Sequence, residues 1–303
     1  MIIDCHTHIW ANAGQMGKAA ERVLRRIGGG KLPPAAPADH SQAARCVSRT
    51  LVFAYRSAAA AALVPNSYVA EYVSANGGAM LGVAAVDPTD RASLGEVDEL
   101  LDRKEFCGLT LDCSGGDFHP ADSRAMGVYE AAAACGKPVF FCHGRHLTVG
   151  GRMEYARPSL LEEIAVEFPK LTIVISSMGY PWVDECIALV ARHERVFADV
   201  APLIRRPWQA HNALAAAHEC GVMDKVLFGS DFPCCTAAEA IETIYRLHEA
   251  TQGTNLPTVP REALRSMVER RALSVLGIAA DDQEPPARAT ADQNEEEAYW
   301  QSC

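Results

Sequence analysis

Short apolar segments recur along the chain, separated by longer stretches of helix-like composition. Most are continuously apolar rather than alternating, as expected for parallel strands covered on both faces. There are eight such segments, at residues 1–6, 50–55, 80–86, 106–112, 137–143, 171–176, 195–200 and 225–230. Eight β/α alternations without a long block of either type predict a single (β/α)8 TIM barrel of the α/β class.

The stretches between the apolar segments carry residues that start and stop helices. Residues 159–162 (SLLE) and 236–239 (TAAE) have the spacing of a capping box, which predicts a helix start at each. Gly136 and Gly221 follow alanine-rich runs, where a glycine commonly ends a helix. These signals support the assignment of helices between the strands.

Two regions differ from this alternation. Residues 11–48 form a long connection after the first strand and contain GGG and PP, which predicts a lid or an edge insertion. Residues 279–303 are acidic and poor in apolar residues, which predicts a disordered tail. We therefore expect one barrel domain over residues 1–278, followed by the tail.

Composition and charge limit the classes of partner. The net charge is −10, and the tail from residue 279 supplies −6 of it with seven acidic residues and one arginine. No basic stripe is present, so nucleic acid is not an expected partner. No apolar stretch approaches the roughly 20 residues needed to cross a membrane, and the first residues lack a signal-peptide pattern. Eleven cysteines without CxxC pairs predict buried thiols in a cytoplasmic protein.

Polar side chains with metal-binding chemistry lie at predicted strand ends. With a period of two, Asp4, His6 and His8 are expected on one face of the first strand. His143 ends the fifth segment and Asp231 follows the eighth. Since loops at the carboxyl ends of barrel strands meet at one face, three imidazoles and one carboxylate should converge there. They suit one divalent transition metal with a position left for water, and Asp231 could bind the metal or act as general base.

These residues carry a resemblance to a known family. The matching stretches are DCHTHIW (4–10), VDP (86–88), 122–143, FPKLTIVISSMGYPWVDE (168–185) and VLFGSDFP (226–233). Together they resemble the amidohydrolase superfamily, in the branch around aminocarboxymuconate-semialdehyde decarboxylase. The resemblance implies that His6, His8, His143 and Asp231 are the metal ligands. It also implies a hydrolase or a non-oxidative decarboxylase, and relatives of this kind are often dimers, which makes a homodimer an expectation.

The sequence departs from the family pattern at two strand ends. The family carries a histidine after strand six, and Ser177 occupies that position here. A serine hydroxyl forms hydrogen bonds but does not shuttle protons near neutral pH as an imidazole does. The fourth strand lacks the family's lysine and has Thr110 instead. One metal is therefore expected rather than two, with zinc foremost and manganese or iron as alternatives.

Three outcomes follow for catalysis. In the first, a mononuclear enzyme uses His146, His119 or Asp231 in place of the missing histidine. In the second, the chain is a metal-free hydrolase, like the family's pyrone dicarboxylate lactonases. In the third, the barrel has lost catalysis and only binds a ligand. The sequence favours the metal-dependent hydrolase, with a decarboxylase as its alternative, because a decarboxylase of this family relies on the histidine that Ser177 replaces.

Cationic and aromatic residues near the predicted strand ends suggest the substrate class. Arg145, Arg152 and Arg205 are candidate anchors for a carboxylate, which an arginine fork binds through two hydrogen bonds. Trp10 is a candidate wall for a planar substrate, and Ser177 a candidate hydrogen-bonding group. A small carboxylated or cyclic organic molecule is the expected substrate.

Overall fold

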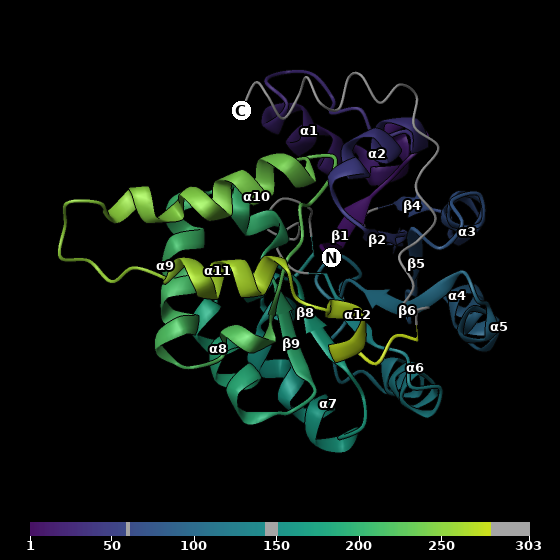
Figure 1. Cartoon of the computed structure of the whole chain (residues 1–303). Coiled ribbons are helices and arrows are strands. Elements are labelled where there is room, and N and C mark those ends of the chain that lie inside the picture. Colours follow the sequence, from purple (N-terminus) through teal and green to yellow (C-terminus); the bar gives the residue numbers. More distant parts are fainter. Residues whose placement is uncertain (59–60, 143–150, 280–303) are drawn as a thin grey trace.

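Eight parallel strands form the central sheet of this computed structural model, which describes residues 1–58, 61–142 and 151–279 (Figure 1). The strands pair in the order β1-β2-β5-β6-β7-β8-β9-β10. They are β1 (Ile3–His8), β2 (Arg49–Phe53), β5 (Met80–Ala85), β6 (Phe106–Leu111), β7 (Val139–Phe141), β8 (Ile173–Ile175), β9 (Val196–Asp199) and β10 (Val226–Leu227). Each falls within or overlaps one of the eight segments expected from the sequence, so the predicted strands are confirmed.

The sheet closes where β1 meets the segment that follows β10. The Cys5 N–H donates to the Phe228 carbonyl at 2.9 Å, and the His8 N–H donates to the Phe232 carbonyl at 2.9 Å. Thr7 and Phe232 form a parallel bridge between these two bonds. We refer to this junction of residues 3–8 with residues 226–232 as the seam. Its hydrogen bonds make the eight-stranded sheet a TIM barrel, as predicted.

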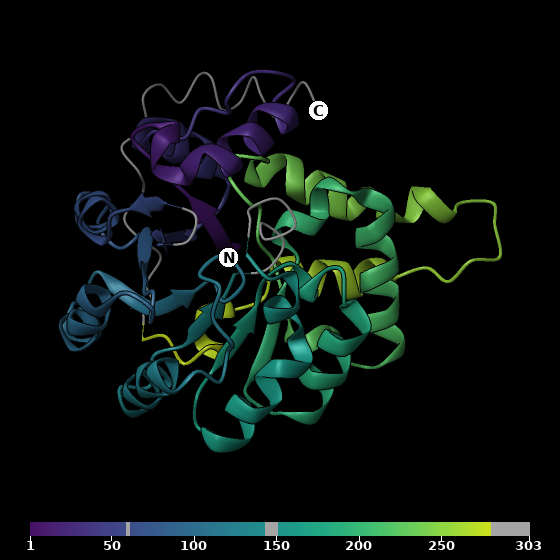
Figure 2. The same ribbon diagram turned by 180° about the vertical axis from the view of Figure 1, so that it is seen from behind.

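Helices surround the barrel, as the two opposite views in Figures 1 and 2 show. The α-helices are α1 (Gly17–Ile27), α2 (Pro37–Ala43), α3 (Asn66–Ser74), α4 (Arg91–Gly95), α5 (Val97–Asp102), α6 (Ser123–Ala134), α7 (Glu162–Glu167), α8 (Val183–Arg192), α9 (Pro207–Glu219), α10 (Ala237–Arg246), α11 (Arg261–Val268) and α12 (Ala272–Val275). None of the helices in the described part of the chain is long and apolar enough to span a bilayer.

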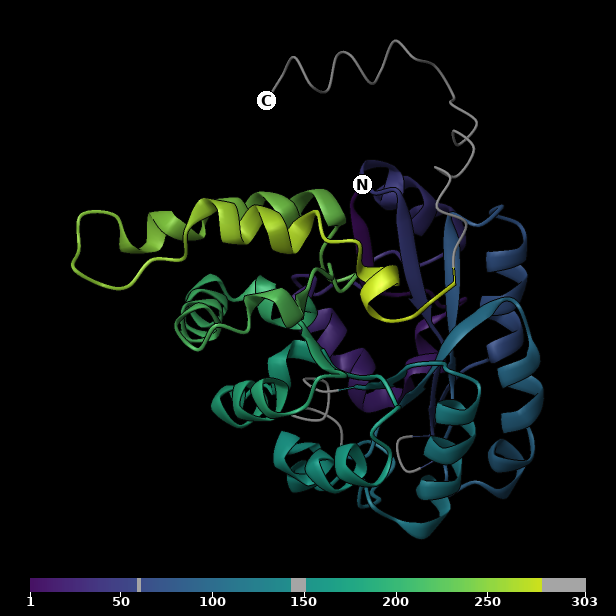
Figure 3. The same ribbon diagram turned by 60° about the horizontal axis from the view of Figure 1, so that its bottom comes forward.

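Shorter elements complete the loops. The 3-10 helices are η1 (Ala13–Met16), η2 (Ala44–Cys46), η4 (Met153–Ala156), η5 (Pro158–Leu161), η6 (Ser176–Gly179), η7 (Ala201–Arg205), η8 (Met223–Lys225) and η9 (Leu247–Thr251). An antiparallel hairpin of β3 (Tyr55–Ser57) and β4 (Ala62–Val64) follows β2. The connection between η9 and α11 extends away from the barrel (Figure 3). The sequence reasoning had not predicted the hairpin.

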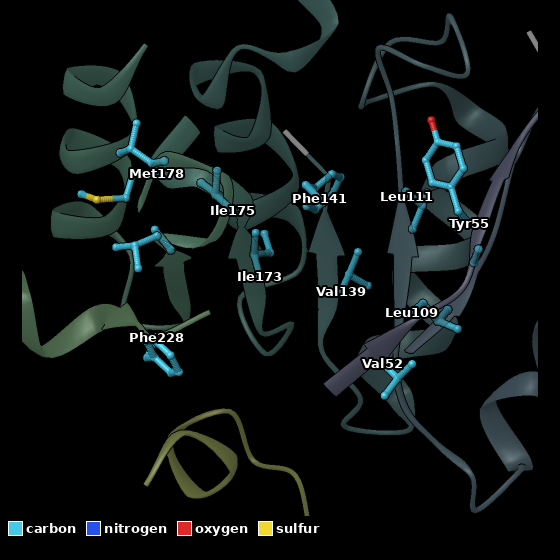
Figure 4. Packing of buried hydrophobic residues seen from close by; sticks show 14 of the residues in the cluster. Val52, Tyr55, Leu109, Leu111, Val139, Phe141, Ile173, Ile175, Met178 and Phe228 are labelled. Atoms are coloured by element: carbon cyan, nitrogen blue, oxygen red, sulfur yellow. The ribbon is translucent and has the colours of Figure 1, made fainter. Parts of the chain in front are cut away.

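The buried apolar residues form two layers, one on each side of the strands. Residues at alternate positions, such as Ile173 and Ile175, pack outward against the helices (Figure 4). Val174, which lies between them, faces the barrel interior. The interior layer also includes Leu273 and Leu276 of the α12 region. This packing follows the two-residue period of β-strands. The inward-facing side chains fill the interior of the barrel.

The predicted helix signals were right at three places and wrong at one. Thr236 and Glu239 form the predicted capping box at the start of α10. Gly136 and Gly221 follow α6 and α9 with positive φ angles of 67° and 71°. The box at residues 159–162 is absent, because residues 158–161 form η5 and the Ser159 hydroxyl bonds to Glu185 at 2.7 Å.

Candidate metal centre and active site

A β-bulge in β1 determines which side chains enter the barrel. Asp4 is paired with Thr50 and Thr7 with Val52, so three steps along β1 oppose two along β2. Cys5 belongs to the interior layer, and His6 stacks on Phe53 of that layer with ring centroids 4.6 Å apart. Asp4 and Thr7 instead lie beside His40, whose Nε2 is 2.8 Å from the Thr7 hydroxyl oxygen. The prediction that Asp4 shares a face with His6 and His8 is therefore wrong, because the bulge interrupts the two-residue period.

Three of the four predicted metal ligands lie together. One ligand atom from each of His6, His8 and Asp231 is within 4.8 Å of the other two, and all three residues are buried. The Nε2 atoms of His6 and His8 are 3.1 Å apart. Asp231 has a φ of 64°, and its N–H donates to the His6 carbonyl at 3.0 Å. The fourth predicted ligand, His143, lies outside the described residues.

The buried carboxylate of Asp199 orients His6, and the sequence reasoning had not assigned it a role. Asp199 ends β9, and its Oδ2 lies 3.0 Å from Nδ1 of His6. Its Oδ1 accepts the backbone N–H groups of Ser177 and Ala201, each at 3.0 Å. A carboxylate accepts the proton on Nδ1, which leaves the lone pair of Nε2 for a metal. An acidic residue at the end of an apolar strand was the available signal.

This arrangement fits a divalent transition metal. Two imidazole nitrogens that bind one zinc at about 2.0–2.1 Å lie roughly 3 Å from each other, and the two Nε2 atoms have this spacing. The carboxylate of Asp231 suits the same metals. Gly229 allows the close approach of β1, since a Cβ there would lie 2.9 Å from Cβ of His6.

Asp231 also contacts a candidate substrate anchor. The Nε of Arg205, in η7 after β9, is 3.3 Å from Oδ2 of Asp231. The Arg205 side chain is 21% exposed, whereas that of Asp231 is 3% exposed. The structure thus places one of the predicted arginines beside the candidate metal centre.

Asp4 supports the same region from outside the barrel. Its Oδ1 accepts the N–H of Ser230 at 2.9 Å and that of His6 at 3.3 Å. Burial raises the pKa of Asp4 to about 6, while the hydrogen bonds from Ser230 and His6 oppose this rise. Asp4 therefore links the two chain segments that carry His6 and Asp231.

Ser177 is buried at the end of β8. Its backbone has a φ of 61°, and its side chain is fully buried. Within the described ranges, the Ser177 hydroxyl has no hydrogen-bond partner. Its N–H bond to Asp199 places Ser177 one hydrogen bond away from the carboxylate that orients His6.

The remaining predicted residues are spread over other positions. His119 and Arg152 both contact Tyr155: the His119 ring centroid is 5.7 Å from that of Tyr155, and the Arg152 guanidinium lies over the Tyr155 ring. Trp10 is 4% exposed and packs in the outer apolar layer, and its role as a wall for a planar substrate stays a prediction. Arg145 and His146 lie outside the described residues.

Thr110 lies where the family lysine was expected. Its hydroxyl is 3.1 Å from the Cys142 sulfur. The nearby Asp112 carboxylate is held within the protein, because it accepts the Tyr55 hydroxyl at 2.8 Å and the Gly115 N–H at 2.7 Å. The groups that make these contacts, two hydroxyls, a thiol and a backbone N–H, are uncharged donors rather than cations.

Comparisons with known proteins identify the family. An uncharacterised TIM-barrel protein of Bordetella bronchiseptica is 22% identical, with a TM-score of 0.70 over 91% of this chain and 99% of that one. A zinc-containing amidohydrolase of Burkholderia multivorans is 13% identical, with a TM-score of 0.67 over 92% and 100%. The 5-carboxyvanillate decarboxylase of Sphingomonas paucimobilis is 14% identical, with a TM-score of 0.63 over 92% and 99%.

At these identities the solved structures establish the shared fold. No curated protein sequence gives a match. The family model described as amidohydrolase matches residues 3–278, which is nearly the whole barrel. The match includes both ends of the seam and every described residue of the candidate centre. The chain belongs to the amidohydrolase family.

Proposed function

We propose that this protein is a metal-dependent hydrolase that acts on a small carboxylated or cyclic organic substrate. The observation that carries the proposal is the pair of buried Nε2 atoms of His6 and His8, 3.1 Å apart, with Asp231 in the same group. The hydrogen bond from His6 to Asp199 supports it, because such a carboxylate is the usual partner of a metal-binding histidine. Zinc is the proposed metal, with manganese or iron as alternatives.

A divalent metal held by these side chains would supply a Lewis acid and lower the pKa of a water molecule. Asp231 would orient the attacking water and accept its proton, since a carboxylate in this buried group can act as a general base. Arg205, which balances the charge of Asp231, carries further N–H donors suited to a substrate carboxylate.

Ser177 favours hydrolysis over decarboxylation in this proposal. Its buried hydroxyl can donate a hydrogen bond to a substrate oxygen, but it cannot deliver and recover a proton as an imidazole would. A decarboxylation needs a proton donor to the carbon that loses CO2. In a hydrolysis, the proton that Asp231 would accept from the attacking water could pass from Asp231 to the leaving group, so no second proton donor is needed.

Elemental analysis of the purified protein tests the proposal directly. We expect about one equivalent of metal in the parent protein and nearly none in the His6→Ala variant, because the variant removes one of the ligands. Absence of metal from both proteins after purification in zinc-containing medium would refute the proposal.

A substrate panel separates the reaction types. Lactones and carboxylated amides report hydrolysis, whereas aromatic carboxylic acids report release of CO2. Hydrolysis that disappears in His6→Ala supports the proposed function. Release of CO2 would assign the protein to the decarboxylases, and a metal-loaded protein without either activity would indicate a barrel that only binds its ligand.

A further inference from the structure

His40 is a buried histidine that comes from the insertion after the first strand. It lies in α2 and is 1% exposed. Its ring nitrogens are each 2.8 Å from a hydroxyl oxygen, Nδ1 from Tyr72 and Nε2 from Thr7. Thr7 is the residue between His6 and His8, and it points outward where they point inward. This part of the insertion, α2, therefore packs directly behind the candidate metal ligands.

If the His40 imidazole is neutral, the donor and the acceptor of each hydrogen bond around it can be assigned. The Thr7 hydroxyl donates to the Leu51 carbonyl at 2.8 Å, because a carbonyl only accepts. The Thr7 oxygen then accepts the proton on Nε2 of His40, and Nδ1 accepts the hydroxyl proton of Tyr72. This chain of hydrogen bonds connects α3, α2, β1 and β2, and each of its donors has an acceptor.

The chain of hydrogen bonds reaches β1 at the bulge. The regular pairing of β1 with β2 is interrupted between Asp4 and Thr7, and the bond from Thr7 to Leu51 joins the two strands at that interruption. A bulge re-aims the side chains that follow it. The Thr7 hydroxyl is thus held by both His40 and Leu51, next to the backbone from which His6 and His8 project inward.

His40 also contacts the other half of the seam. Its ring meets that of Phe232 edge to face, with centroids 5.0 Å apart. Phe232 follows Asp231 in the sequence, forms the bridge with Thr7 and accepts the His8 N–H. One side chain thus touches both segments that carry the described metal ligands.

We propose that His40 is a positioning residue for the candidate metal centre. It holds the β1 bulge and the Asp231 turn in the geometry that directs His6, His8 and Asp231 to one point. The inference rests on the proposed function, because it requires that these side chains bind a metal. Through His40, the 11–48 insertion would hold the metal ligands in place before the metal binds, from outside the barrel.

Metal affinity tests the proposal without an activity assay. The protein is stripped of metal with a chelator, and zinc affinity is measured by competition with a chromophoric chelator at a temperature well below unfolding. We expect His40→Leu to bind zinc about tenfold more weakly, the lower end of the range for residues that support metal ligands. His40→Gln should recover most of the affinity, because the glutamine amide can still donate to Thr7.

The visible spectrum of the cobalt-substituted protein gives a second readout. Ligand-field bands report the geometry of the ligands, so they should change in His40→Leu and return towards the parent spectrum in His40→Gln. A residue that only stabilised the fold would lower the melting temperature and leave both the bands and the zinc affinity unchanged.

His211→Leu is the matched control. His211 is equally buried, at 3% exposed, but lies in α9, and neither of its ring nitrogens has a hydrogen-bond partner in the described part of the chain. It should lose stability without losing zinc affinity. If His40→Leu does not fold, Thr7→Val removes the hydrogen bond to His40, together with the one to Leu51, and keeps the side-chain shape, so a loss of affinity at least as large is expected.

The outcomes separate the two proposals. A parent protein that binds none of zinc, manganese and iron refutes the proposed function. A parent protein that binds zinc, together with His40→Leu or Thr7→Val variants that bind it equally well and show unchanged cobalt spectra, overturns the role of His40 alone.

Discussion

At the scale of single residues, Asp199 shows what the sequence could and could not reveal. Its place at the end of an apolar strand was visible, but its partner His6 is 193 positions away. His6 and His8 were found because their chemistry and spacing are local. Asp199 acts only through residues that the closed barrel brings to it, and the inward direction of its side chain depends on a register that the sequence does not display.

Replacing Asp199 by asparagine should weaken the metal centre without removing a ligand. The neutral amide no longer stabilises the N–H on Nδ1 of His6, so zinc affinity should fall by about 10- to 100-fold. Competition with a chromophoric chelator measures the change, with His211→Leu as the comparison variant. An Asp199→Asn protein that binds zinc as tightly as the parent would show that this hydrogen bond does not tune His6.

At the scale of elements, local signals predicted strands and helix ends better than they predicted which way side chains face. All eight barrel strands were found from apolar runs, whereas the bulge in β1 reversed the expected side for Asp4. The predicted capping box at 159–162 was wrong because Ser159 lies inside η5, the 3-10 helix that precedes α7. Whether a strand bulges or a turn becomes a 3-10 helix depends on how neighbouring elements pack against it. The composition of the segment alone does not reveal that packing.

The start of α6 offers a pH-dependent prediction. The Asp122 carboxylate caps this helix by accepting the Arg124 N–H at 3.0 Å. The hydrogen bonds from the Arg124 side chain lower the pKa of Asp122 to about 2, although partial burial opposes this shift. Because the pKa is depressed in the folded state, the cap stabilises the protein above the ordinary pKa of an aspartate and is lost as pH falls toward 2.

Asp122→Ala should therefore reduce the free energy of unfolding by about 1 kcal/mol at neutral pH, the usual value of an N-cap. Urea unfolding monitored by circular dichroism should give the same difference from pH 7 down to about pH 5 and a shrinking difference below about pH 4. A difference that grows on acidification would contradict this assignment.

At the scale of the whole molecule, the candidate centre lies at the seam. His6 and His8 belong to the first strand, and Asp231 follows the last. A metal bound by all three joins the two edges of the sheet, so binding should stabilise the closed barrel over the open chain. The sequence predicted the closed barrel from the number of strands, but not that the hydrogen bonds of the seam would run between the ligands themselves.

Removal of metal should accordingly lower the melting temperature. A ligand present at about 100 times its dissociation constant adds about 2.7 kcal/mol of stability, which corresponds to a rise of a few degrees for a protein of this size. Differential scanning calorimetry with and without a chelator should show this loss in the parent protein. His6→Ala should melt at the same temperature in both conditions, and an equal chelator effect in both proteins would place the stabilising metal elsewhere.

The seam also sets the time at which the candidate centre can form during synthesis. The histidines of β1 leave the ribosome more than two hundred residues before Asp231. At roughly 5–20 residues per second, translation separates them by ten seconds or more. Until β10 emerges, β1 has an unpaired edge, and its two imidazoles lack the carboxylate of Asp231. Acquisition of the metal would then mark the completion of the barrel, because it requires both ends of the sheet to have met.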